Sequence, residues 1–207
     1  MSRMHFQEVK CVNCGHVGKF NVWDSINVDT DSKIKEEVKS LDFFKYTCPK
    51  CGNDFQVDYL TVYNDIKNHF MVYYVPKEDI EVVDKIKQIS LPEKCEDKAR
   101  IVFSKNDLLE KICVFEAMLN DVLIELIKPF VISKVEEDGI KECEAEKIYF
   151  SNYENGKITF SFPEVKDNYK VDIPVQLYEE LWRRNKIKKL KGFQIVDKNN
   201  AATYLEK

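Results

Sequence analysis

Apolar and polar residues alternate along the first third of the chain, a pattern typical of β-strands. The clearest case runs from Lys19 to Val28, where Phe20, Val22 and Ile26 are apolar. Similar patterns predict further strands over residues 5–10, 43–47, 54–63 and 69–75. We expect the last two of these strands to form a hairpin, because the residues between them are typical of a turn.

Two short segments have helical periodicity instead. Residues 29–32 provide helix-start signals, and Ile34, Val38 and Leu41 follow at helical spacing. Residues 78–89 carry apolar side chains three apart, which predicts a second short helix.

The strongest helical pattern covers residues 104–130. It begins with a capping-box-like sequence, its apolar residues repeat in heptad steps, and Pro129 is expected to end it. The wide apolar stripe favours a buried core helix over the alternative, the seam of a homodimeric coiled coil. Asp121 and Glu125 lie one helical turn apart, and we expect both carboxylates to be solvated rather than catalytic.

The last part of the chain predicts a small hairpin, a strand and a helix. Residues 147–151 and 157–162 flank Asn155-Gly156, a dipeptide that favours tight hairpin turns. Residues 169–173 predict another strand, and a helix is expected from 174 to about 190. Its buried face is expected to carry Leu177, Tyr178, Leu181 and Trp182.

Two cysteine turns carry the clearest chemistry in the sequence, Cys11-Val12-Asn13-Cys14-Gly15 and Cys48-Pro49-Lys50-Cys51-Gly52. Two intervening residues let one tight turn direct both sulfurs at a single ion, and a structural zinc takes four such ligands. We therefore predict one Zn²⁺ per chain, bound by Cys11, Cys14, Cys48 and Cys51. A redox pair and a disulfide framework are the alternatives. His16 is expected to lie outside the coordination shell.

These patterns together predict an α+β fold. It comprises an N-terminal zinc ribbon with a helical insert, a long central helix, and a C-terminal small β-hairpin plus helix. We expect a zinc-ribbon domain over residues 1–76, a connecting segment with the long core helix over 77–133, and a C-terminal α+β region over 134–207.

The composition of the chain restricts the classes of function that it can have. The net charge of −4 gives no overall basic footprint for nucleic acid. Neither a membrane-spanning apolar run nor a secretion-signal pattern is present, so a cytoplasmic protein is expected. One local basic run occurs at the end of the last predicted helix. It comprises Arg183, Arg184, Lys186, Lys188 and Lys189. A phosphate or nucleic-acid contact is one interpretation of this run, and a solvated helix end is the other.

The order of cysteine turn, strand, helix, strand, cysteine turn and hairpin resembles the CpXC protein family of bacteria and archaea, which is defined by two C-P-x-C motifs. The matching stretches are the two cysteine turns, Ser25-Ile26-Asn27-Val28, Phe44-Lys45-Tyr46-Thr47, Val62-Tyr63-Asn64-Asp65, Leu108-Leu109-Glu110-Lys111-Ile112, Phe115-Glu116-Ala117 and residues 122–128.

The chain departs from this family's pattern at three positions. Val12 replaces the proline of the first motif, and Met118 stands where the resemblance implies glycine. Asn64 departs from the family's tyrosine-and-aspartate segment, which corresponds here to Val62-Tyr63-Asn64-Asp65. The resemblance implies zinc binding in the cytoplasm, and it implies no activity.

Three hypotheses follow. The first is a non-enzymatic zinc-binding protein whose structural Cys₄ site supports a protein-interaction module, with another protein or a second copy, joined through the 104–130 helix, as partner. The second is a zinc-ribbon nucleic-acid-binding protein that uses the basic helix end. An enzyme is the third and least favoured, because four thiolates leave zinc no open position and no catalytic motif is present.

Overall fold

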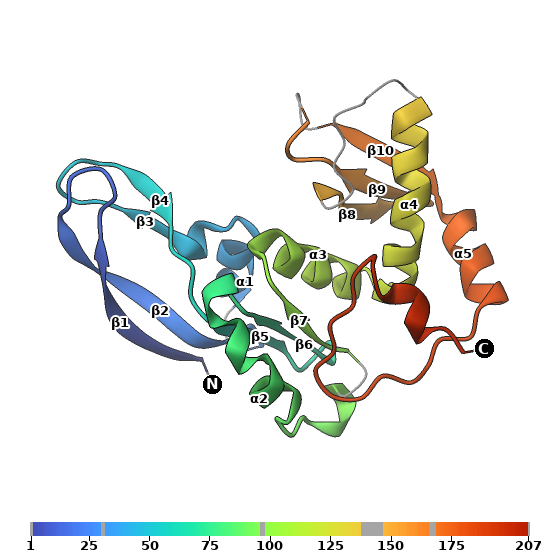
Figure 1. Cartoon of the computed structure of the whole chain (residues 1–207), viewed down its shortest axis with the longest axis horizontal. Helices are drawn as coiled ribbons and strands as arrows, with labels where there is room; N and C mark the ends of the chain where they lie inside the picture. The colour runs from blue at the N-terminus through green and yellow to red at the C-terminus, as the bar shows by residue number, and fades with distance from the viewer. Residues whose placement is uncertain (1, 30–31, 96–97, 138–146, 166–168, 207) are drawn as a thin grey trace.

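The computed structural model describes residues 2–29, 32–95, 98–137, 147–165 and 169–206. Its centre is a mixed five-stranded sheet with the strand order β1-β2-β5-β6-β7 (Figure 1). Neighbouring strands are antiparallel except for the β2–β5 and β6–β7 pairs, which are parallel. The strands are β1 (Arg3–Lys10), β2 (Val17–Asn27), β5 (Thr61–Asp65), β6 (Phe70–Tyr74) and β7 (Ala99–Val102).

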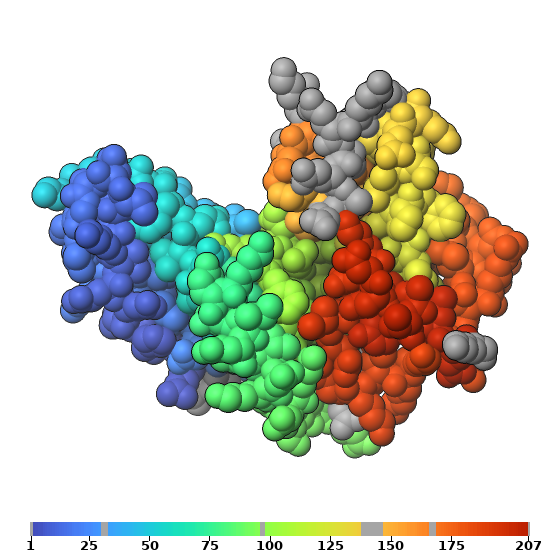
Figure 2. Space-filling model, viewed as in Figure 1, coloured from blue at the N-terminus to red at the C-terminus, as the bar shows by residue number. Residues whose placement is uncertain are grey.

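The hairpin of β1 and β2 extends beyond this sheet and lies beside a second, shorter hairpin made of β3 (Lys45–Thr47) and β4 (Asp54–Gln56). We call these four strands and their turns the cysteine ribbon. It forms a separate lobe of the molecule, blue and cyan in Figure 2. The single strand expected over 54–63 is wrong, because the chain leaves the ribbon after Gln56 and enters the central sheet at Thr61.

Aromatic side chains join the two hairpins of the ribbon. Tyr46 is buried, and its ring lies 6.1 Å from that of Phe20 and 5.3 Å from that of Phe55. Gly18 permits this packing, since a Cβ atom built at Gly18 would lie 2.0 Å from the Tyr46 hydroxyl oxygen. The ribbon therefore has a small core of its own in addition to its cysteines.

Helices cover the central sheet. α1 (Ser32–Lys39) is the predicted insert between the cysteine turns, although its start signals Thr30 and Asp31 lie outside the described residues. The predicted helix over 78–89 is a 3-10 segment, η2 (Lys77–Val82), followed by α2 (Val83–Lys87). Two further 3-10 turns are η1 (Asp42–Phe44) and η3 (Glu93–Cys95).

The helix predicted over 104–130 is wrong as a single element, because it divides into α3 (Lys105–Glu116) and α4 (Asp121–Glu137). Met118 adopts a left-handed backbone with φ of 56°, and the Asn120 side chain then accepts from the Val122 N–H at 3.0 Å to begin α4. A left-handed residue interrupts the ladder of helical hydrogen bonds. Pro129 does not end α4 but lies inside it.

The last part of the chain forms a three-stranded antiparallel sheet in the order β10-β9-β8. Its strands are β8 (Tyr149–Glu154), β9 (Lys157–Ser161) and β10 (Lys170–Pro174). The predicted Asn-Gly turn is present, with φ of 51° at Asn155 and 74° at Gly156. α4 lies between this small sheet and the last helix, α5 (Val175–Arg184), in the view of Figure 1.

The last helix is shorter than expected. α5 (Val175–Arg184) ends where Asn185 becomes extended, so the lysines of the basic run lie in non-helical chain. Trp182 was expected on the buried face, but 54% of it is exposed. Two isolated bridges hold the chain that follows α5: Ile187 pairs with Leu205, and Gln194 pairs with Arg100 of β7. η6 (Ala201–Tyr204) follows, and among the described residues no helix is long and apolar enough to span a membrane.

Candidate metal centre and buried ion network

The two cysteine turns are the tips of the ribbon's hairpins and have the same backbone geometry. In the first, the Gly15 N–H donates to the Cys11 carbonyl at 2.9 Å, and in the second the Gly52 N–H donates to the Cys48 carbonyl at 2.9 Å. Both glycines have φ of +70°, a conformation that glycine adopts without steric cost. The repeated geometry directs the two sulfurs of each turn toward the other turn.

The structure brings all four predicted ligands together. Their Sγ atoms lie within 4.8 Å of one another, with Cys11–Cys51 and Cys14–Cys48 both at 3.7 Å. A tetrahedral ion with metal–sulfur bonds of ~2.3 Å requires sulfurs separated by about 3.8 Å. The observed separations fit this requirement and are far longer than a disulfide bond of ~2.05 Å. The four cysteines therefore form a cluster suited to a metal ion.

Neighbouring groups stabilise negative charge on one sulfur of the cluster, that of Cys51. At Cys14, a backbone hydrogen bond from His16 lowers the pKa, but burial and the other three cysteines outweigh it and raise the pKa to about 11. The Asn53 backbone N–H and the Asn13 side chain lower the pKa of Cys51 to about 6, and Asn13 Nδ2 lies 3.6 Å from Cys51 Sγ. A lower thiol pKa favours the thiolate, which is the form that binds metal. His16 takes part in this turn through its backbone, and its carbonyl accepts from the Cys11 N–H at 2.8 Å.

The basic run lies at the opposite end of the molecule from the cysteine ribbon (Figure 1). Four of its side chains have partners: Arg184 pairs with Glu180, and Lys186 pairs with Glu206 at 2.6 Å. The Lys188 ammonium donates to the Thr203 carbonyl at 2.6 Å, and Arg183 Nε donates to the Glu179 carbonyl at 3.3 Å. Within the described residues, Arg183 and Lys189 form no ion pair. The five cations therefore do not act as one free surface.

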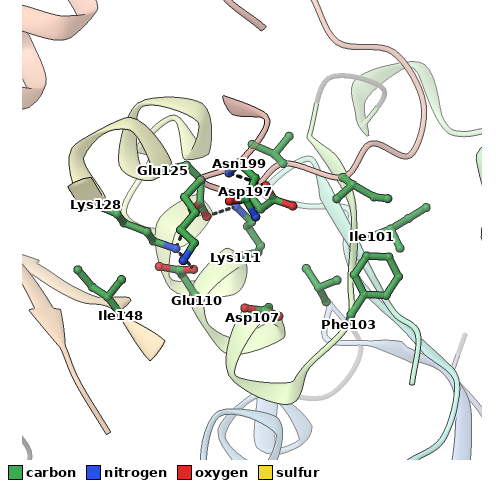
Figure 3. Close-up of a pocket in the computed structure, with 14 residues that line it drawn as sticks. Ile101, Phe103, Asp107, Glu110, Lys111, Glu125, Lys128, Ile148, Asp197 and Asn199 are labelled. Carbon is green, nitrogen blue, oxygen red and sulfur yellow. Dashed lines mark hydrogen bonds and ion pairs between the residues drawn. The ribbon is translucent and has the colours of Figure 1, made fainter. Parts of the chain in front are cut away.

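A second group of charges was missed from the sequence. Asp121 and Glu125, expected to be solvated, are only 1% and 3% exposed. They belong to a continuous buried network in which each carboxylate has a cationic partner. Figure 3 shows the part of it that comprises Glu110, Lys111, Glu125 and Lys128. The other members are Arg100 from β7, Glu110 and Lys111 from α3, and Lys128 from α4.

The network is a chain of close contacts from one sheet to the other. Asp121 accepts two hydrogen bonds from Arg100, at 2.7 and 2.8 Å, and lies 3.3 Å from Lys111. Glu125 then bridges Lys111 and Lys128, both at 2.8 Å.

Glu110 completes the chain, with one oxygen 2.8 Å from Lys128 and the other accepting from the Phe150 N–H of β8 at 2.6 Å. Charged groups thus link the central sheet, both long helices and the C-terminal sheet.

Burial and ion pairing have opposite effects on these acids. Burial alone would raise the pKa of Asp121, but Arg100 and Lys111 outweigh it and lower the pKa to about 2. Burial raises the pKa of Glu110 above its ordinary value, and Lys128 opposes this shift. The sequence did contain a signal for this network, since acids and lysines occur on all faces of two otherwise apolar helices, α3 and α4. A charged residue on a fully buried helix needs a partner of opposite charge.

The two hairpin tips bring four cysteines together, so this α+β protein has a Cys₄ cluster that could hold a metal ion. A family model described as CpXC protein matches residues 9–128, which is more than half of the chain. The chain therefore belongs to the CpXC protein family. No curated protein and no solved structure matches it.

Proposed function

We propose that this chain is a non-enzymatic zinc-binding protein whose Cys₄ site holds the ribbon in shape as a protein-interaction module. Four thiolates at tetrahedral spacing are a ligand set that suits Zn²⁺. They complete its coordination and leave no position for a substrate, which supports a structural role. The metal keeps two thin hairpins together as one rigid lobe.

The observation that carries the proposal is the exposed edge of β1. This strand ends the five-stranded sheet, pairs with β2 along one side, and has no partner on the other side among the described residues. Phe6 is 64% exposed and Met4 39% exposed on one face of β1, where Met4 lies opposite Trp23 of β2. An unpaired strand edge with apolar side chains is a template for a strand from another protein or a second copy.

Photo-crosslinking tests this surface in cells. A photoreactive phenylalanine analogue at Phe6 should give one discrete adduct, identified by mass spectrometry as another protein or a second copy. Phe6→Glu should weaken the binding of that partner about tenfold or more, because it places a charge in an apolar contact. The same analogue at Tyr153, which is 39% exposed on the C-terminal sheet, is the control. Equal adducts from both positions, or none from Phe6, would contradict the proposal.

A specific feature also favours nucleic-acid binding as a second candidate. The exposed Trp182 lines two adjoining hollows, one with Lys98, Glu179 and Arg183 and the other with Lys98, Lys188 and Lys189. Its ring stacks on Tyr178 with 6.5 Å between centroids. An aromatic surface flanked by cations suits an unpaired base and its phosphates. This candidate does not involve the cysteine ribbon, which lies at the far end of the molecule (Figure 1).

Fluorescence anisotropy with labelled single-stranded RNA at low salt tests this candidate. Trp182→Ala should weaken binding by about 5- to 100-fold, since one base–aromatic stack contributes ~1–3 kcal/mol. Tyr153→Ala removes an exposed aromatic ring elsewhere and should leave the affinity unchanged. A flat titration of the wild-type chain would exclude this candidate.

A further inference from the structure

A cavity of about 160 Å³ opens beside the buried ion network. Its polar side is formed by Asp107, Glu110 and Lys111 of α3, by Glu125 and Lys128 of α4, and by Asp197, Lys198 and Asn199 of the segment before η6. Its apolar side consists of Ile101, Phe103, Ile148, Ile195 and Val196. Figure 3 shows Ile101 and Phe103 facing Asp107 and Lys111 across the open space. One wall is thus charged and the other hydrophobic.

The charged wall retains hydrogen-bonding capacity. An ammonium group has three N–H donors, and Lys111 and Lys128 each use two of them in ion pairs within the network. Each therefore retains one donor for a further acceptor. Both belong to the cavity lining, so a ligand there can reach them.

Asp107 supplies the opposite charge. One of its oxygens accepts from the Ser104 hydroxyl at 2.6 Å, and within the described residues no ion pair joins its carboxylate to Lys111 or Lys128. Burial raises the pKa of Asp107, and the two nearby ammonium groups counteract part of that shift. Asp107 and these two ammonium groups therefore line the same cavity, and within the described residues no ion pair joins them.

We propose that this cavity binds a small zwitterion, an α-amino acid with an apolar side chain. Its carboxylate would accept the remaining N–H donors of Lys111 and Lys128, and its ammonium group would pair with Asp107. Its side chain would lie against the apolar wall.

The size of the cavity agrees with this class of ligand. An apolar cavity of about 150 Å³ holds a six-membered ring. The present cavity, with about 160 Å³ and an open side, therefore accommodates an amino acid with a branched side chain such as leucine. This inference is independent of the ribbon's interaction surface.

Thermal unfolding of the zinc-loaded full chain tests the proposal with L-leucine, L-isoleucine and L-methionine as probes. At a fivefold excess over Kd, a specific ligand should raise Tm by about 2–4 °C for a chain of this length. Isocaproate lacks the ammonium group of leucine and isoamylamine lacks its carboxylate, so neither should raise Tm. Equal Tm shifts from leucine, isocaproate and isoamylamine would overturn the proposal, as would the absence of a shift with every amino acid tested.

Two variants locate the site. Asp107→Asn should weaken leucine binding at least tenfold in calorimetry, because it removes the partner of the ammonium group, whereas Asp84→Asn changes an exposed carboxylate and should have no effect. Ile195→Trp should abolish binding by filling the cavity from a half-buried loop position, and Ile80→Trp, at an exposed position, is its control. Undiminished binding by Ile195→Trp would place the ligand elsewhere and contradict the proposal, even if Asp107→Asn fails to fold.

Discussion

Cys48→Ser is expected to unfold the cysteine ribbon while leaving the rest of the molecule folded. Cys48 is 1% exposed and contributes one of four sulfurs within 4.8 Å of one another. A structural zinc contributes ~10–16 kcal/mol of apparent binding free energy, and losing one thiolate removes much of it. The two strands of the second hairpin have only three residues each, so without the metal their hydrogen bonds and few aromatic contacts are insufficient.

Elemental analysis and amide hydrogen exchange measure this outcome. The wild-type chain should contain one equivalent of zinc, and the variant far less. Protection of residues 3–27 and 45–56 should fall to that of an open chain, whereas α3 and α4 keep theirs, because α3 packs against β6, β7 and β8 and α4 packs against η6, α5 and β10. Cys113→Ser alters a cysteine outside the cluster and is the control. Equal zinc and equal protection in Cys48→Ser would refute the metal site.

Removing Asp121 is expected to cost the protein about 3–5 kcal/mol of unfolding free energy. The substitution Asp121→Ala leaves Arg100 without its two-point partner and Lys111 with Glu125 alone, and all of these groups are buried. Breaking a buried pair costs this much because the remaining charge keeps its desolvation penalty without compensation. Asp84→Ala removes an exposed carboxylate and should change stability by no more than ~0.5 kcal/mol.

Urea unfolding at several pH values completes this test. The folded pKa of Asp121, about 2, lies below its ordinary value of 3.8, so protons bind preferentially to the unfolded chain. The stabilisation from Asp121 is therefore complete above about pH 4 and is lost as the pH falls toward 2. Asp121→Ala should show a weaker loss of stability across that interval. A variant as stable as Asp84→Ala at pH 7 would show that the network does not stabilise the fold.

The features that were predictable from the sequence are those determined by neighbouring residues. The cysteine turns depend on two ligands and a glycine within five positions, and the turn at Asn155-Gly156 depends on two residues with positive φ. The family resemblance also anticipated glycine at position 118, and this is where Met118 adopts a left-handed backbone.

Features that depend on distant partners were not predictable in the same way. The apolar repeat of residues 104–130 continues across the break at Met118, so periodicity alone indicates one helix where the structure has two. The burial of Asp121 depends on Arg100, which lies on a strand before α3. The sequence shows both charges, but only the packing of β7 against the helices brings them together.

The pairing of Gln194 with β7 has a consequence for how the chain reaches its native state. All four residues of β7 are buried, and the Gln194 N–H and carbonyl bond to Ala99 and Ile101 at 3.0 and 2.9 Å. During synthesis, β7 leaves the ribosome long before this covering segment does, and its outer edge stays open in the meantime. Non-local pairings of this kind slow folding and expose strand edges to aggregation. The outer edge of β7 is therefore covered only late in synthesis, and until then β7 is most in need of protection by a chaperone.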